Sequence, residues 1–255
     1  IPMFVDNLGE ISEEWGYLLL LGTLIQSIIF GLLIIFIPLT ARWKDIFRGK
    51  KGTLGVIVYY ACLGLGYMLV EIFLIQKLVF FLGDPIFSVS IVITSMLIIS
   101  GLGSLFAGRF GDRRAFAVYI AAAGIVVSLL FYIFGLTPLL NAFLGLPFFV
   151  KALLSIVFIA PSAFFLGIPF RSGLASLTEH KERLLPWAWG MNGALSVTGS
   201  VIAKLVSIST GFSIVLGVAG VLYIIAALVF KSNQAGGEVN AETVIAAAAP
   251  SRALD

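Results

Sequence analysis

Seven stretches of this chain are apolar over a length that crosses a membrane, and this limits the fold more than any other feature. A helix needs about 20 apolar residues to span about 30 Å of hydrocarbon. Stretches of that kind lie at residues 16–40, 54–82, 86–107, 115–137, 147–170, 186–208 and 211–230. We therefore predict an all-α polytopic membrane protein with about seven transmembrane helices.

The composition excludes several other classes. Of the 255 residues, 60% are hydrophobic and 11% are charged, whereas a soluble domain has about 25% charged residues. The net charge of +3 is too small for a nucleic-acid-binding surface, so no nucleic-acid partner is expected. The single cysteine, Cys62, and the single histidine, His180, cannot form a disulfide framework or a His/Cys metal cluster. We expect no metal and no cofactor, and we expect the chain to contact the lipid bilayer.

Basic residues gather in alternate loops, which predicts the orientation. They follow the first, third and fifth spans, at Arg42, Lys44, Arg48, Lys50, Lys51, Arg109, Arg113, Arg114, Arg171, Lys181 and Arg183. The loops at 83–85, 138–146 and 209–210 have no Lys or Arg. Because short loops rich in Lys and Arg stay in the cytoplasm, we predict the N-terminus outside and the C-terminus inside.

The loop after the third span has the most specific pattern, with the sequence GSLFAGRFGDRR at 103–114. Small residues recur every four positions around it, which would let another helix approach closely. Its charged residues, Arg109, Asp112, Arg113 and Arg114, are candidates for a cytoplasmic latch. The alternative is a simple basic anchor beside a packing face.

This loop is similar to the cytoplasmic loop between the second and third helices of major facilitator superfamily transporters. The resemblance implies that residues 54–230 form a six-helix membrane bundle like one half of that fold. Residues 16–40 would then be an extra transmembrane helix and 1–15 an external segment. Residues 231–255 lack a pattern that buries a face, so we expect a disordered cytoplasmic tail. Since the chain starts at Ile1, we also expect a fragment.

A polar face runs along the second span. Tyr60, Gly64, Tyr67 and Glu71 are spaced by four, three and four residues, which places them on one side of a helix. An ionisable group inside a span costs about 2.5–3.5 kcal/mol and normally faces protein or a water-filled cavity. If a solute binds, Glu71 is the predicted polar contact and Tyr67 the neighbour that orients it.

The sixth span offers a matching polar row in four-residue steps, Asn192, Ser196, Ser200 and Lys204. At 1.5 Å per residue, Glu71 lies about 26 Å and Lys204 about 27 Å from the inner ends of their spans. We predict an ion pair or hydrogen-bonded network between Glu71 and Lys204, with Asn192 and Ser196 as hydrogen-bonding groups for a solute. The alternative is that Lys204 snorkels to the outer headgroups while Glu71 is protonated or bonded to a Tyr or Ser.

The fifth span contains Pro161, Gly167 and Pro169. A proline removes a backbone donor and bends a helix, so neighbours or water must satisfy the freed carbonyl groups. Such a broken helix can line a substrate site, or the prolines can serve packing alone.

Two stretches resemble a more specific family. Residues 59–83, YYACLGLGYMLVEIFLIQKLVFFLG, and residues 186–201, PWAWGMNGALSVTGSV, look like the C-terminal membrane region of bacterial spermidine synthase-like proteins. In that family, membrane helices flank an aminopropyltransferase-like or methyltransferase-like domain. The resemblance implies a multi-pass protein of the bacterial inner membrane, with an upstream soluble domain that would hold any catalytic site. A cytoplasmic domain of that kind conflicts with an external N-terminus.

We expect a non-catalytic integral membrane module of a spermidine synthase-like protein that transports or presents a small, cationic solute. No pairing of a nucleophile with a base is visible, so no catalytic residue is assigned. The alternative is a structural or anchoring subunit of a larger membrane complex, with the small-residue faces of the third and sixth spans as partner surfaces. The expected partners are the upstream domain, a partner subunit or a second copy in a homodimer.

Overall fold

The computed structural model describes residues 15–16, 18–31, 33, 53–111, 113–180 and 182–248, and the side chains among them up to 230 except at 179 and 180. Six helices in this part of the chain are long and apolar enough to cross a membrane. A shorter apolar helix, Leu18–Gly31, lies within the first predicted span, whose far end falls outside the described residues. The predicted all-α, polytopic class is therefore confirmed.

The elements follow one another with short connections. They are α2 (Thr53–Leu82), α3 (Pro85–Ala107), a 3-10 turn (Gly108–Phe110), α4 (Arg114–Phe131), a π turn (Tyr132–Leu136), α5 (Thr137–Ala142), α6 (Phe148–His180), a 3-10 turn (Glu182–Leu184), α7 (Leu185–Ser209) and α8 (Phe212–Ala248). The α4 helix, the π turn and α5 together make one span.

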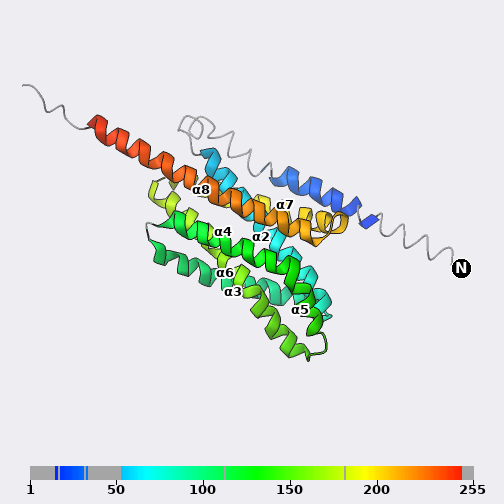
Figure 1. The fold of residues 1–255 in the computed structure, drawn as a ribbon. Helices are drawn as coiled ribbons and strands as arrows, with labels where there is room; N and C mark the ends of the chain where they lie inside the picture. The colour runs from blue at the N-terminus through cyan, green and yellow to red at the C-terminus, as the bar shows by residue number, and fades with distance from the viewer. Residues whose placement is uncertain are drawn as a thin grey trace, which may run out of the picture.

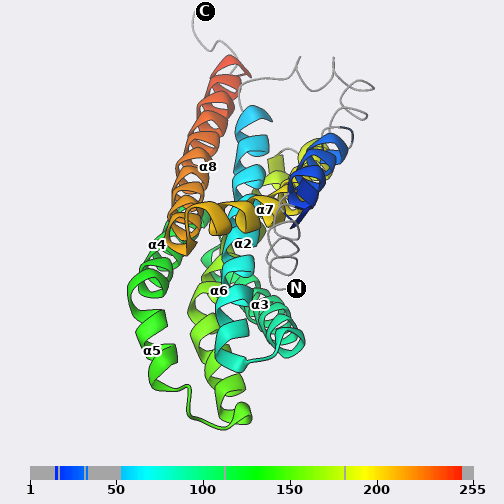
Figure 2. The same ribbon diagram turned by 90° about the vertical axis from the view of Figure 1, so that its right-hand side faces the viewer.

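Helix α2 lies at the centre of the bundle. It packs most extensively against α7 and α8 and also contacts α3 and α6, while α4 packs against α6 and α8 (Figures 1 and 2). Accordingly, large side chains of α2 such as Tyr59, Val70 and Phe73 are at most 2% exposed. A helix that is apolar all round and buried on most sides belongs in the interior of a membrane bundle.

Helices α3 and α6 cross at glycines. A β-carbon on Gly103 would overlap the Phe164 carbonyl oxygen, and one on Gly167 would overlap the Ser100 carbonyl oxygen. Small residues let backbones meet in this way where lipid gives no hydrophobic drive for association. Part of the small-residue face of the third predicted span is thus used for packing within this chain.

The connection from α2 to α3 is a tight hairpin at Gly83-Asp84-Pro85. Gly83 adopts a positive φ of 77°, which favours glycine. The Asp84 carboxylate accepts hydrogen bonds from the backbone N–H groups of Ile86 at 2.8 Å and Phe87 at 3.1 Å. With Pro85 in the first turn, these bonds fix the start of α3.

Tyrosines from other helices bind carbonyl groups beside the two prolines of α6. The Tyr132 hydroxyl lies 2.7 Å from the Phe158 carbonyl oxygen and 2.6 Å from the Ser162 hydroxyl, next to Pro161. The Tyr59 hydroxyl donates to the carbonyl of Pro169 at 2.6 Å. The helix continues through both prolines, and the two tyrosines tie this part of α6 to α2 and to the π turn after α4.

Several helices extend past their predicted ends. Helix α6 continues from the predicted end at 170 to His180, and α8 continues as far as Ala248, beyond the bundle and into the predicted tail (Figure 1). Hydropathy marks only the part of a helix that suits lipid. An alanine-rich segment such as 246–249 favours a helical backbone without an apolar face.

Candidate functional site

The polar face of α2 lies at its contact with α7. The backbone of Asn192 is so close to Gly64 that a β-carbon on residue 64 would overlap the Asn192 carbonyl oxygen. At the next residue of α2, the backbone of Leu65 lies 3.2 Å from the β-carbon position of Gly199 on α7. Glycine on both helices thus forms a close α2–α7 contact, which we call the α2–α7 seam.

Polar side chains of α7 bind the backbone of α2 along the seam. The Asn192 amide nitrogen donates to the Tyr60 carbonyl oxygen at 3.4 Å. The Ser196 hydroxyl lies 2.7 Å from the Asn192 carbonyl and 3.3 Å from the Gly64 carbonyl. The structure therefore brings the predicted residues Asn192 and Ser196 together with Tyr60 and Gly64.

Tyr67 and Glu71 lie further along the same side of α2, and both are half-buried. Tyr67 is close enough to Glu71 and to Ser100 on α3 for electrostatic interactions with both. Tyr67 therefore lies near α3, and it is also close to Tyr223 of α8. Ser100 belongs to the row of small residues, four positions apart, that leads into the loop at 103–114 and that the sequence assigned to helix packing.

Glu71 and Lys204 form no ion pair, although the structure describes both residues. Lys204 is exposed on α7, a position from which a lysine can extend its stem along apolar surface toward the headgroups. This exposure favours the snorkelling alternative, and a hydrogen-bonded network that links Glu71 and Lys204 stays a prediction.

Tyr60 has a feature that the sequence pattern did not reveal. Its side chain is 1% exposed, and its hydroxyl has no hydrogen-bond partner in the described part of the chain. The hydroxyl lies 2.8 Å from the β-carbon position of Gly173 on α6, and the ring meets Phe170 edge to face. Only the α2–α6 packing, which brings together residues more than a hundred positions apart, creates this environment.

The proposed latch residues lie at the end of the bundle where α3 ends and α4 begins. Arg109 is exposed, with its guanidinium 5.4 Å from the centre of the Phe106 ring. Arg113 is exposed just before α4, and Arg114 is the first residue of that helix. Asp112 lies outside the described residues, so the latch stays a prediction.

The chemistry available at the seam is that of a binding site. Glu71 lies near Tyr67, and the Asn192 amide and Ser196 hydroxyl lie further along the same side of α2. A carboxylate can attract a cation, and hydroxyl and amide groups can orient it through hydrogen bonds. In the described residues, no three His, Cys, Asp or Glu side chains gather closely enough to hold a metal ion.

Comparison of the chain with protein-family models, with curated proteins and with solved structures finds no match.

Proposed function

We propose that this chain is a non-catalytic membrane module that binds a small organic cation beside the α2–α7 seam, for transport or presentation. Glu71 supplies the negative charge and Tyr67 orients the solute. Asn192 and Ser196 offer hydrogen bonds from α7. The chain is an integral multi-pass membrane protein, and the site lies within its spans.

The observation that carries this proposal is Glu71 itself. It is a carboxylate inside a membrane-spanning helix, half-buried and without an ion pair among the described residues. Because a charge at this depth is costly, acidic residues in spans usually face a partner or a polar cavity. A cationic solute would be such a partner, and the adjacent Tyr67 and Ser100 add hydroxyl groups that can orient it.

The resemblance of residues 59–83 and 186–201 to spermidine synthase-like proteins points to the same class of solute. A polyamine is a flexible cation that a carboxylate between two helices would select over a neutral molecule. The resemblance of the loop at 103–114 to major facilitator transporters fits the same proposal, since such transporters bind solutes where their repeats meet.

Solute-dependent stabilisation tests this function. The purified full chain would be heated with spermidine, and with choline and glycerol as cationic and neutral comparisons, and its Tm recorded. Binding to the folded state raises Tm, so spermidine should stabilise the wild type and glycerol should not.

Two matched variants decide whether Glu71 is responsible for the stabilisation by spermidine. Glu71→Gln removes the charge at the seam, and Glu182→Gln makes the same change at an exposed position after α6. The first should abolish stabilisation by spermidine while the protein stays folded, and the second should leave it intact. Equal stabilisation of Glu71→Gln and wild type would exclude this site.

A second function, a structural or anchoring subunit, is favoured by the exposure of α3 and α7. Only 28% of the apolar stretch of each of these two spans is buried, compared with 50% in α2. Gly101 on α3 and Gly193 on α7 have open space where a β-carbon would lie. Gentle purification from membranes would test this role: an anchoring subunit keeps a stoichiometric partner chain, whose loss on Gly193→Ile would identify the contact.

A further inference from the structure

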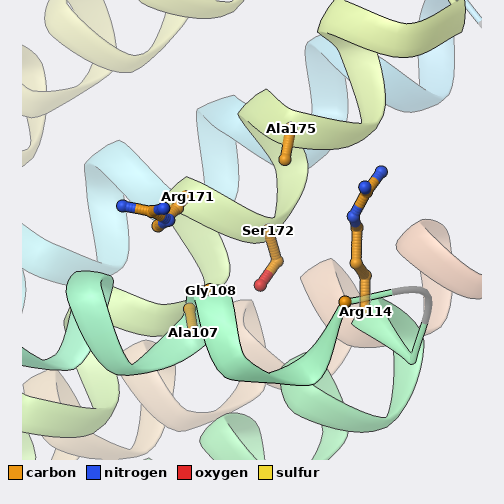
Figure 3. A pocket seen from close by; sticks show the side chains of 7 residues that line it. Ala107, Gly108, Arg114, Arg171, Ser172 and Ala175 are labelled. Atoms are coloured by element: carbon orange, nitrogen blue, oxygen red, sulfur yellow. The ribbon is translucent and has the colours of Figure 1, made fainter.

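A pocket opens at the end of the bundle that carries the arginines, apart from the seam. It has a volume of about 180 Å³ and lies among the end of α3, the start of α4 and the last turns of α6. Two arginines border it, Arg114 from α4 and Arg171 from α6. In Figure 3, Ser172 lies between them, and Ala175 lies one turn further along α6.

Glycines in the connecting segment give the pocket its shape. A β-carbon on Gly108 would lie 3.1 Å from a terminal nitrogen of the Arg171 guanidinium, so glycine leaves this group room against the backbone. Gly111 adopts a positive φ of 47° where the chain turns toward α4. The turn brings Arg114 to the pocket wall, although 57 positions separate it from Arg171.

The buried wall of the pocket is polar as well. Ser172 is 3% exposed, and its hydroxyl donates to the Ile168 carbonyl at 2.9 Å. Two more arginines, Arg109 and Arg113, belong to the same connecting segment and are exposed. Arginines from two separate segments of the chain thus lie at or beside this pocket.

This chemistry fits a phosphate group. Arginine presents a planar fork of N–H donors that matches phosphate oxygens and makes strong charge-assisted hydrogen bonds. The volume is well above the roughly 30 Å³ that one water molecule takes in the liquid, so it can hold a tetrahedral anion. The pocket also lies where membrane-spanning helices end, which is the depth of lipid headgroups.

We propose that the pocket binds a phosphate-bearing anion, with Arg171 and Arg114 as the cationic contacts. A phosphatidylglycerol headgroup and free inorganic phosphate share this chemistry. The site does not depend on the proposed solute at the α2–α7 seam.

Two binding measurements on the full chain distinguish the sources. In one, native mass spectrometry counts phosphatidylglycerol retained from nanodiscs that also contain phosphatidylcholine. In the other, inorganic phosphate is titrated in detergent without phospholipid, at constant ionic strength against chloride, and Tm is recorded. Retention in the first measurement alone indicates a lipid site, and a saturable Tm increase in the second indicates that free phosphate suffices.

Three variants test whether the anion binds in this pocket. Arg171→Gln removes a charge at the pocket, Ala175→Leu fills the pocket without changing charge, and Arg183→Gln removes an exposed charge after α6. Arg171→Gln should weaken binding about fivefold, as expected for one cationic contact at a membrane surface. Ala175→Leu should weaken binding because leucine takes the volume that the anion would fill, and Arg183→Gln should bind like the wild type. Size-exclusion profiles and Tm without ligand check the folding of each variant.

The proposal is overturned if neither phosphate source binds. It is also overturned if Arg183→Gln weakens binding as much as Arg171→Gln, because the attraction would then be diffuse. Unchanged binding by a folded Ala175→Leu protein would place the anion outside the pocket. Because one variant removes charge and the other fills volume, the failure of either one to fold leaves the other as a test.

Discussion

Gly64 of α2 lies directly against the backbone of Asn192 on α7, with no room for a β-carbon between them. The same glycine carbonyl lies 3.3 Å from the Ser196 hydroxyl. The close contact therefore does two things: it sets the distance between the two helices, and it holds the polar side chains of α7 against the backbone of α2.

Gly64→Ala should destabilise the protein by about 1–3 kcal/mol, the usual cost of adding volume to a packed interior. The atoms that the new methyl group meets are backbone atoms, which cannot rotate away. The change would appear as a lower Tm of the purified protein. Gly193→Ala is the control, because its β-carbon would enter open space on α7; similar Tm losses in both would contradict the account.

Gly103→Ala should disturb the α3–α6 crossing in the same way, since the new β-carbon would meet the Phe164 carbonyl. The neighbouring Gly101 has no atom within 4 Å of its β-carbon position. Gly101→Ala should therefore be neutral or slightly stabilising, because alanine favours a helix more than glycine does. Proteolysis rates of the two variants in detergent would separate them, and equally rapid cleavage would be the contrary result.

Tyr132→Phe should lower the stability by about 1 kcal/mol. The change removes the hydroxyl that lies 2.7 Å from the Phe158 carbonyl and 2.6 Å from Ser162, beside Pro161. Thermal unfolding would measure the loss. Tyr119→Phe in the same span is the matched control, because the Tyr119 hydroxyl makes no hydrogen bond within the described residues. A Tyr132→Phe protein as stable as this control would argue against a stabilising bond between the Tyr132 hydroxyl and α6.

Asp84→Ala should cost about 1 kcal/mol through the loss of the helix cap on α3. The carboxylate accepts from two backbone N–H groups, and both would lose their partner. Asp84→Asn should retain most of the stability, since asparagine caps helices nearly as well. Tm values that rank Asn with Ala, below the wild type, would show that the charge matters rather than the cap.

The fold class could be predicted from the sequence because a helix surrounded by lipid needs a long run of apolar residues. Six such helices appear in the described residues. The sequence also predicted the polar rows of α2 and α7 through helical spacing. It did not predict how far α6 continues, since a helix can leave the membrane without changing its backbone. Buried Leu177, beyond the predicted end of that span, packs there against the core.

The contacts that complete the site and the pocket depend on packing between distant segments. Tyr59 binds the carbonyl of Pro169 across 110 positions, and Gly108 meets the guanidinium of Arg171. Spacing within one helix shows which residues share a face, but it does not show which helix covers that face. These pairs therefore needed the three-dimensional structure.

Equilibrium binding of labelled spermidine to the purified full chain tests the central claim most directly, with wild type and Glu71→Gln compared at the same pH and ionic strength. Binding weakens by about 2–5 kcal/mol when a buried charge pair loses one member, so Kd should rise at least about thirtyfold in the variant. Saturable binding by the wild type with that rise would support a cation site at Glu71. Equal Kd values for the two proteins would contradict it.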